Sequence, residues 1–400
     1  MKSRTIVGLD VGTKNLKMAV AKVAEESEDL EILGIEQVPS FGVRKGVVVR
    51  PEETAKHIAV LARKLEQAAG VRIEEVFVNL GGSRLFSTPS HGLVAVSRAD
   101  GNISKEDVDR VLQAAQTFSL SQNQEILEVF PRQFVVDGEQ GVREPIGMRA
   151  VRLEADVLAV CLFSPDLKNL TDAVTEAGLE IADVIPSPLA ASSSVLSPQQ
   201  KEMGTVLVDL GAQTTSFAVF EEGDLIHIAV LPVGSENITH DIAIGLRTEH
   251  DTAERIKTEY GSCITSKGKR TEKLQLQSGE IFPFSQKLVT HIIEARVKEI
   301  LQLLNKELKK LEKQGQLPGG VVFTGGGARL PKLVEFAKKE LKLPAKIGNP
   351  QGVVIAEKDP SLFVVLGLLQ EGIPKEQEIH SKKPSSVMRI IKKLFTSFIP

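Results

Sequence analysis

The chain has 400 residues, of which 42% are hydrophobic and 4% aromatic, with no tryptophan. That size suits about two or three domains with cores of their own. A net charge of -3 and so few aromatic rings argue against nucleic-acid binding, which relies on basic surfaces and stacking platforms. No apolar run approaches the ~20 residues that span a bilayer. The first residues lead directly into a predicted strand, so we predict no signal peptide.

Cysteine and histidine usage predicts neither disulfides nor a zinc site. Cys161 and Cys263 have no C-x-x-C partner, and we expect reduced, structural thiols in the cytosol. The seven histidines are scattered and show no H-E-x-x-H or Cys/His spacing, so the sequence predicts no protein-bound zinc.

The first half of the chain alternates predicted strands and helices. Two strands around a turn are expected at 5–23, further strands at 31–38 and 76–80, and an amphipathic helix at 51–69. Residues 83–161 then change character. A helix capped by Ser104 and Asp107 runs to Thr117, and strands at 126–136 and 152–163 flank a loop rich in glycine and proline. We therefore predict a small α+β insertion.

The second half repeats the strand-rich pattern and adds longer helices. Helices are predicted at 165–177 and 186–196, a hairpin at 204–231, helices at 251–260 and 283–314, a strand at 321–327, a helix from Pro331 and a core helix at 361–369. The long helix could form a coiled coil, but one helix packed on the protein surface is the simpler interpretation.

Two stretches about 200 residues apart share one pattern. Each is an apolar, β-branched run that ends in Asp-x-Gly and is followed by a hydroxyl side chain: Ile6–Thr13 and Val206–Thr215. Glycine in such a turn lets backbone N–H groups approach an anion, and an aspartate at a strand end can hold hydrated Mg²⁺. One such loop can be a plain turn. Two of them, one in each half, predict a duplicated fold that closes on one polyphosphate.

We predict a nucleotide site where four segments converge, with ATP and Mg²⁺ as its ligands. The first loop contributes Asp10, Gly12, Thr13 and Lys14, and the second contributes Asp209, Gly211, Thr214 and Thr215. Lys14 would supply a point charge to the phosphates, and Asp10 and Asp209 are the candidate catalytic and water-mediated metal-binding residues. Gly325, Gly326 and Gly327 follow a strand, so backbone can pass close to adenine or phosphate. Glu254 and Lys257, at i and i+3 of a helix, could reach a ribose or base; taken alone, such a pair is more often a solvated salt bridge.

In this order the motifs resemble the actin/sugar-kinase/heat-shock-chaperone superfamily, and nearly the whole chain resembles the FtsA family of bacterial cell-division proteins. The stretches that carry the resemblance are Gly8–Thr13, Phe130–Asp137, Pro145–Met148, Val233–Ala243, Ala253–Lys257 and Val322–Ala328. Gly234 joins the expected nucleotide-binding residues through this resemblance. No G-x-x-x-x-G-K-[ST] is present, and Leu330 stands where a Rossmann fingerprint needs its third glycine.

The resemblance implies an α/β fold of two actin-like, ribonuclease-H-like halves around a nucleotide cleft. The expected divisions are 1–82, 162–202 and 350–370 for the first half, 83–161 for an inserted SHS2-like subdomain, 203–245 and 315–349 for the second half, 246–314 for a helix-rich subdomain, 371–385 for a flexible linker and 386–400 for a membrane-targeting amphipathic helix.

The resemblance also implies partners and a place in the cell. It implies head-to-tail filaments, other division proteins on the insertion, and recruitment of the tubulin-like protein FtsZ to the cytoplasmic face of the membrane at the division site. The acidic C-terminal peptide of FtsZ would dock on 246–314, whose basic residues are Arg247, Lys257, Lys267, Lys269, Arg270, Lys273, Lys287, Arg296 and Lys298. Acidic residues are interspersed there, and a solvated face is the alternative.

The second phosphate loop departs from the family pattern. The family usually continues Gly-Gly-x-Thr-Thr-Asp, whereas this chain has Ala212, Gln213 and Ser216. Gln213 could orient a water, although a simple surface substitution ranks above that role. We therefore expect ATP binding with at most weak ATPase activity.

The last residues have the pattern of a helix that lies on a membrane. On a helical wheel, apolar side chains fill one half, among them Met388, Ile391, Leu394, Phe395 and Phe398, and Arg389, Lys392 and Lys393 lie opposite. Large apolar residues opposite a basic face are typical of a helix on anionic lipid. The polar run before it disfavours the alternative, a helix docked on the body of its own protein.

Two other functions remain open from the sequence. A sugar kinase on the same fold would need a carboxylate base and sugar-binding polar groups, and no motif for either stands out. A pilus-assembly actin-like adaptor would not need a lipid-binding helix of its own, so the tail argues against it.

Overall fold

The computed structural model describes residues 5–23, 30–265, 271–276, 279–353, 355 and 358–373. The predicted amphipathic helix at 386–400 and most of the predicted linker at 371–385 therefore lie outside the described residues. None of the helices within the described ranges has the length and apolar character needed to cross a membrane.

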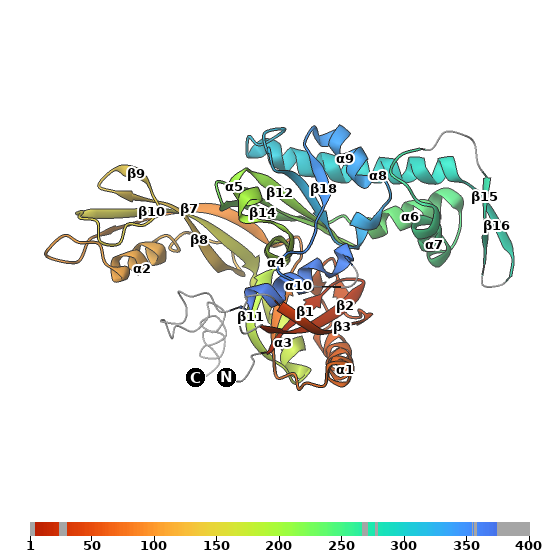
Figure 1. Cartoon of the computed structure of the whole chain (residues 1–400), viewed down its shortest axis with the longest axis horizontal. Coiled ribbons are helices and arrows are strands. Elements are labelled where there is room, and N and C mark those ends of the chain that lie inside the picture. Colours follow the sequence, from red (N-terminus) through yellow and green to blue (C-terminus); the bar gives the residue numbers. More distant parts are fainter. Residues whose placement is uncertain are drawn as a thin grey trace.

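Two sheets repeat the same strand order (Figure 1). The first has the order β11-β6-β1-β2-β3, with β1 (Thr5–Val11), β2 (Asn15–Val23), β3 (Leu30–Pro39), β6 (Glu75–Leu80) and β11 (Glu180–Pro186). The second contains β18-β17-β12-β13-β14, with β12 (Thr205–Leu210), β13 (Thr215–Glu221), β14 (Asp224–Leu231), β17 (Gly320–Thr324) and β18 (Ala345–Ile347). In each, an antiparallel three-stranded meander is followed by two strands parallel to its first strand. This repetition confirms the duplication predicted from the twin loops, which form the β1–β2 and β12–β13 turns.

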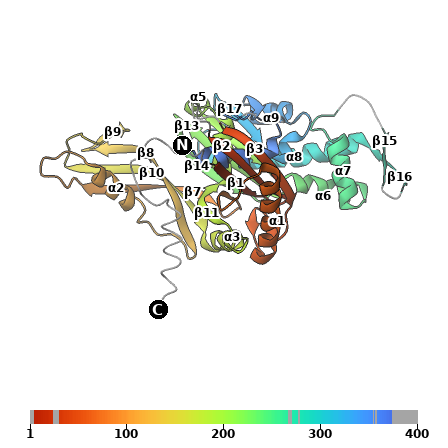
Figure 2. The ribbon, with the colours of Figure 1, turned by 60° about the horizontal axis from the view of Figure 1, so that its bottom comes forward.

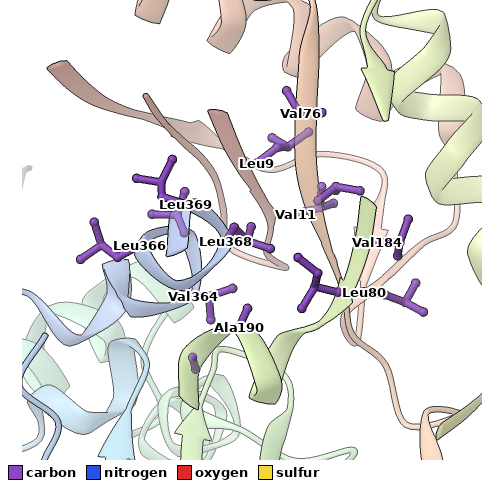
Figure 3. Packing of buried hydrophobic residues seen from close by; sticks show 14 of the residues in the cluster. Leu9, Val11, Val76, Leu80, Val184, Ala190, Val364, Leu366, Leu368 and Leu369 are labelled. Carbon is purple, nitrogen blue, oxygen red and sulfur yellow. The ribbon is translucent and has the colours of Figure 1, made fainter. Parts of the chain in front are cut away.

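Helices cover both faces of the first sheet. One face carries α1 (Pro51–Ala69) and α3 (Ser164–Glu176), and the other carries α4 (Ser187–Val195) and α10 (Phe363–Glu371). Figure 3 shows side chains of α10 packed among those of β1, β6, β11 and α4. Gly367 lets α10 cross α4 closely, because a Cβ there would lie 1.6 Å from the Ala190 carbonyl oxygen. A larger residue at that position would force the two helices apart.

The insertion is built onto the edge of the second sheet. Its elements are β7 (Phe86–Ala95), α2 (Lys105–Ala114), β8 (Gln124–Val136), β9 (Glu139–Val142) and β10 (Arg152–Phe163). The pair Ala229–Phe86 joins β7 to β14, so one nine-stranded sheet runs through both parts. Ser104 and Asp107 form the predicted capping box of α2, whereas β7 and β9 were not predicted. The sequence placed this subdomain within the first half, and the structure attaches its strands to the second.

The helix-rich subdomain lies at the opposite end of the molecule from the insertion (Figures 1 and 2). It contains α6 (Ser235–Leu246), α7 (His250–Tyr260), the hairpin β15 (Thr271–Gln275) and β16 (Ile281–Ser285), and α8 (Gln286–Lys310). The predicted helix at 283–314 is therefore shorter at both ends, and Pro283 belongs to a strand. The apolar stripe of α8 is buried in a core that includes α6 and α7, so α8 is the packed helix and not a coiled coil.

The remaining elements are short or adjust predicted bounds. They are β4 (Val43–Arg44), β5 (Val47–Val48), α5 (Pro198–Glu202), the 3₁₀ turns η1 (Gly326–Arg329) and η2 (Pro360–Leu362), and α9 (Leu333–Leu341). The predicted strand at 321–327 ends at residue 324. Cys161 and Cys263 are buried and unpaired with each other, and burial raises the pKa of their thiols to about 11 and about 12.

Candidate functional site

A cavity of about 480 Å³ lies between the two halves and brings together most of the predicted site residues. The predicted residues that line it are Asp10, Gly12, Thr13, Lys14, Asp209, Gly211, Thr214, Glu254, Lys257, Gly325, Gly326 and Gly327. They come from both Asp-x-Gly turns, from α7 and from the glycine triplet after β17. The four segments expected to converge do so.

Asp10 lies at the end of β1 and is only 4% exposed. Its Oδ2 accepts a hydrogen bond from Lys17 Nζ at 2.7 Å, and its Oδ1 accepts one from Asn79 Nδ2 at 2.9 Å. Asn79, at the end of β6, also accepts from the Val11 amide at 2.6 Å and donates to Ser187 Oγ at 3.0 Å. This buried carboxylate is therefore both paired and held in one orientation.

Lys17, Asn79 and Ser187 line the cavity but were not predicted from the sequence. A signal for two of them was present. Lys17 interrupts the apolar run Leu16–Ala21, and Asn79 stands near the end of the buried run Val76–Leu80. A polar residue at a buried strand position needs a partner, which is a reason to place it at a site.

Asp209 occupies the equivalent place at the end of β12. Its Oδ1 lies 3.3 Å from Thr324 Oγ1 and its Oδ2 lies 3.5 Å from Ser216 Oγ. The pKa of Asp209 is raised to about 6, mainly by burial and also by the nearby Asp10 carboxylate, while the Lys17 ammonium opposes both effects. Two carboxylates at the floor of the cleft thus share one cation. Their oxygen donors are of the kind that hydrated Mg²⁺ takes, so the residues present fit the predicted metal.

The glycine triplet brings the end of β17 against the second loop. Gly325 has a φ of 83°, and a Cβ there would lie 2.5 Å from Asp209 Oδ1 and 2.6 Å from the Leu210 carbonyl oxygen. Only glycine tolerates both the conformation and the approach. The Gly325 amide donates to the Pro360 carbonyl at 2.9 Å.

Two contacts cross the mouth of the cleft, and a third lies beside them within the first half. Lys14 Nζ on the first loop lies 2.5 Å from Glu254 Oε1 on α7. The Lys45 amide, in the β4–β5 turn, donates to Gln213 Oε1 on the second loop at 2.9 Å, and the neighbouring Gly46 amide donates to Thr13 Oγ1 at 2.9 Å. The side-chain oxygen of Gln213 thus accepts a hydrogen bond from the backbone of the other half.

Glu254 and Lys257 form an ordered pair on the wall of the cavity. Lys257 is 7% exposed, lies 2.6 Å from Glu254 Oε2 and donates to Thr239 Oγ1 at 2.7 Å. Burial would raise the pKa of Glu254, but hydrogen bonds from Lys14, Lys257 and Thr239 outweigh it and lower the pKa to about 2. Burial lowers the pKa of Lys257, against the opposing effect of Glu254. The salt bridge considered from sequence is therefore not a solvated one, since Lys257 is buried and the Glu254 side chain is 23% exposed.

Thr215 and Gly234 do not line the cavity, in contrast to the prediction. Thr215 is buried, and its Oγ1 donates to the Val233 carbonyl at 2.8 Å. A Cβ on Gly234 would lie 2.5 Å from the Ala212 carbonyl oxygen. Both residues therefore support the second loop through contacts outside the cavity.

Comparison with known proteins agrees with the geometry. Residues 206–367 match the family model "Cell division protein FtsA", and residues 82–161 match "SHS2 domain inserted in FTSA". The cell division protein FtsA of Bacillus subtilis is 37% identical over 367 residues, which cover 91% of this chain and 82% of the relative. The chain belongs to the FtsA family. FtsA of Pseudomonas aeruginosa is 35% identical over 94% of this chain and 91% of its own length.

Solved structures support an actin-like fold for this FtsA-family protein. A chain of a PilM–PilN type IV pilus biogenesis complex superposes with a TM-score of 0.67 at 17% identity, covering 92% of this chain and 99% of the other. MreB5 of Spiroplasma citri gives 0.56 at 14% identity, covering 98% and 99%. The resemblance drawn from the motifs, the actin-like halves and the SHS2 insertion are confirmed. The FtsA family is therefore favoured over the pilus-assembly and sugar-kinase alternatives.

Proposed function

We propose that this FtsA-family protein binds ATP with Mg²⁺ in the cleft, polymerises head to tail, and tethers FtsZ filaments to the cytoplasmic membrane. The observation that carries the proposal is the cavity in which the two Asp-x-Gly turns, one from each half, line the same space. The structures of MreB5, which share the fold, were solved with ADP and with AMPPNP.

The residues present suit a magnesium nucleotide. The glycine-containing turns offer backbone N–H groups to phosphate oxygens, Lys17 offers a buried positive charge beside Asp10, and Mg²⁺ would neutralise the repulsion between the Asp10 and Asp209 carboxylates. Weak hydrolysis at most is consistent with Ala212 and Ser216 in the second loop, and with Gln213 engaged by the Lys45 amide. A bound nucleotide would then act mainly by contacting both halves of the protein, and less by being hydrolysed.

Closure of the cleft offers a way for nucleotide to control assembly. The direct contacts across the mouth are an ion pair and a backbone hydrogen bond at partly exposed positions, which are individually weak. A ligand that binds both loops at once would favour the closed arrangement by its differential affinity for it. Closed subunits of one shape would then stack into filaments.

Nucleotide binding can be tested with two lysines on the same strand. We expect Mg·ATP to bind the wild type in equilibrium dialysis, and Lys17→Met to reduce the affinity by at least about tenfold because a charge-assisted phosphate contact is lost. Lys22→Met, on β2 but away from the cavity, should bind as the wild type does. Equal binding by Lys17→Met, with its fold verified by circular dichroism, would contradict the site.

Three exposed basic residues support a docking surface for the acidic FtsZ peptide within 246–314. Within 246–314, Lys257, Arg296 and Lys298 already pair with acidic groups of this chain, and Lys267, Lys269 and Arg270 lie outside the described residues. Arg247, Lys273 and Lys287 are exposed. Their charge remains available to an acidic partner.

Exposed apolar side chains support the same surface. Ile244 on α6 is 76% exposed and Leu288 on α8 is 41% exposed. A Cβ on Gly245 would touch Ile292, one turn from Leu288, so the two apolar residues come from helices that pack on each other. An acidic peptide that also carries apolar side chains could contact both the exposed basic residues and the exposed apolar residues of this surface.

Peptide binding can be measured by fluorescence anisotropy with a labelled FtsZ C-terminal peptide. We expect Ile244→Asp and Lys287→Glu each to weaken binding by at least about tenfold, since each places a negative charge where an acidic peptide would dock. Val60→Asp, which replaces a comparably exposed apolar residue on α1 (53% exposed), should leave binding unchanged. If all three variants bind alike, this docking surface is wrong.

Membrane attachment is proposed to reside in residues 386–400. One amphipathic helix binds lipid weakly and reversibly, so a filament that carries many of them would bind by avidity. A chain lacking residues 386–400 should still polymerise with ATP but should not sediment with anionic liposomes. Sedimentation of the truncated chain would overturn the assignment of the anchor. Other division proteins would meet the protein at the insertion.

A further inference from the structure

Glu236, His240 and His250 meet where α6 and α7 join, and none of the three lines the nucleotide cavity. Glu236 and His240 are four residues apart on α6 and therefore share one face of the helix. His250 is the first residue of α7. The candidate ligand atoms, one carboxylate oxygen and two imidazole nitrogens, all lie within 4.8 Å of one another. Among the described residues, this is the one group of three or more such side chains that meets so closely.

The orientation of His250 suits a metal ligand. Its Nε2 lies 3.8 Å from Glu236 Oε1, and its Nδ1 lies 3.7 Å from Asp251 Oδ1. The Nε2 atom therefore faces the Glu236 carboxylate, on the side where a shared metal ion would lie, whereas the Asp251 side chain is fully exposed and too far away for a hydrogen bond. The His240 and His250 rings lie 4.9 Å apart at 54°, so both imidazoles border the same space.

We propose that Glu236, His240 and His250 bind a divalent transition-metal ion of the Zn²⁺ type. Two imidazoles and one carboxylate suit Zn²⁺, Ni²⁺ or Cu²⁺, whereas Mg²⁺ and Ca²⁺ prefer oxygen ligands alone. Bonds of about 2.0–2.1 Å in a tetrahedron hold ligand atoms about 3.3 Å apart. The side chains of His250 and Glu236 are 42% and 30% exposed, so they can rotate to close the remaining gap. Water would complete the coordination.

A metal at this site would join the two helices that form one wall of the cleft. Residues 247–249 connect α6 to α7, and the same helices carry Thr239, Glu254 and Lys257. These three residues already form a hydrogen-bonded set between the helices. The metal would add a second link between α6 and α7 beside this set. This inference does not depend on nucleotide binding, since it involves other residues and another class of metal.

The first test is a Zn²⁺ titration of the full-length protein without a polyhistidine tag. By isothermal calorimetry we expect one Zn²⁺ per chain. His240→Gln and His250→Gln should each weaken binding by at least about tenfold, because each removes one imidazole ligand. His291→Gln replaces an exposed histidine on α8 outside the cluster and should bind as the wild type does. Wild-type affinity in both His240→Gln and His250→Gln, with the fold verified by circular dichroism, would overturn the proposal, as would no binding by the wild type.

Hydrogen exchange separates a bridging ion from one held by a single histidine. Zn²⁺ should slow amide exchange in α6 and α7 of the wild type, because the ion links the two helices, and should not do so in His240→Gln. Zn²⁺ binding without added protection of these helices would overturn the bridged site.

Discussion

Replacing Asp209 by asparagine should stabilise the ligand-free protein while it abolishes its response to magnesium nucleotide. The pKa of Asp209 is raised to about 6 from an ordinary value of 3.8, so the folded protein binds a proton more tightly than the unfolded chain does. Stability attributed to this group is therefore highest below the unfolded pKa and falls as pH rises from about 4 to about 6.

The size of the effect follows from the shift. About two pKa units at 1.36 kcal/mol per unit give a penalty of roughly 3 kcal/mol above pH 6. Asparagine carries no charge and keeps one oxygen that can accept a hydrogen bond from Thr324 or Ser216. The hydrogen bond to the replaced oxygen is weakened, which costs about 1 kcal/mol. The net gain in the free energy of unfolding is expected to be about 2 kcal/mol at pH 7.5.

Urea denaturation followed by far-ultraviolet circular dichroism measures this difference, since the chain has no tryptophan and one tyrosine. The stability advantage of Asp209→Asn should fall by about 1.5 kcal/mol between pH 7.5 and pH 5, because the wild-type carboxyl group becomes protonated in that range. Asp172→Asn, which removes an exposed carboxylate on α3 paired with Lys168, should change stability by less than about 0.5 kcal/mol at either pH.

A nucleotide arm completes the experiment. Mg·ATP should raise the denaturation midpoint of the wild type by mass action and leave that of Asp209→Asn unchanged. The reasoning would be refuted if Asp209→Asn proved less stable than the wild type at pH 7.5, or if its advantage did not depend on pH.

Two further pairs of variants probe the walls of the cleft. Glu254→Gln should lower the free energy of unfolding by about 3 kcal/mol, because it leaves the buried Lys257 ammonium without its counter-charge. Lys14→Ala should lower it by less than about 1 kcal/mol, because the Lys14 side chain is 61% exposed. Equal losses in urea denaturation would contradict the pairing of Glu254 with a buried Lys257. Since the pKa of Glu254 is lowered to about 2, its contribution should be present above pH 4.5 and lost as pH falls toward 2. Gly325→Ala should lower the free energy of unfolding by at least about 2 kcal/mol more than Gly178→Ala does. Both glycines have positive φ. A Cβ on Gly325 would lie within 3 Å of Asp209 and Leu210, whereas nothing lies within 4 Å of a Cβ on Gly178. Similar melting temperatures for the two alanine variants would show that close packing at Gly325 is unimportant.

The features that the sequence predicted correctly are local ones. The Asp-x-Gly turns, the capping box of α2 and the buried stripe of α8 depend on residues within a few positions of one another, and hydrophobic period and turn chemistry report on that range. The duplication and the family resemblance came from such local patterns repeated in order. The strands β11 and β18 and the β15–β16 hairpin were missed because edge and short strands carry weak periodicity. The long inner strand β7 was missed because Pro89 and Gly92 interrupt its sequence pattern.

The tertiary structure decided which side chains meet. Local spacing favoured Lys14 as the cation of the first loop. In the structure Lys17 pairs with Asp10, and Lys14 pairs with Glu254, which lies 240 residues further along the chain. Thr215 looked like its neighbour Thr214, but Thr215 begins β13 and its side chain is buried, whereas Thr214 stays in the loop that lines the cavity. His240 and His250 have no metal-binding spacing in the sequence, and only the packing of α6 against α7 brings them together. A sequence determines strands and turns through neighbours along the chain, whereas the partner of a charged or polar group depends on which distant segments the fold places beside it.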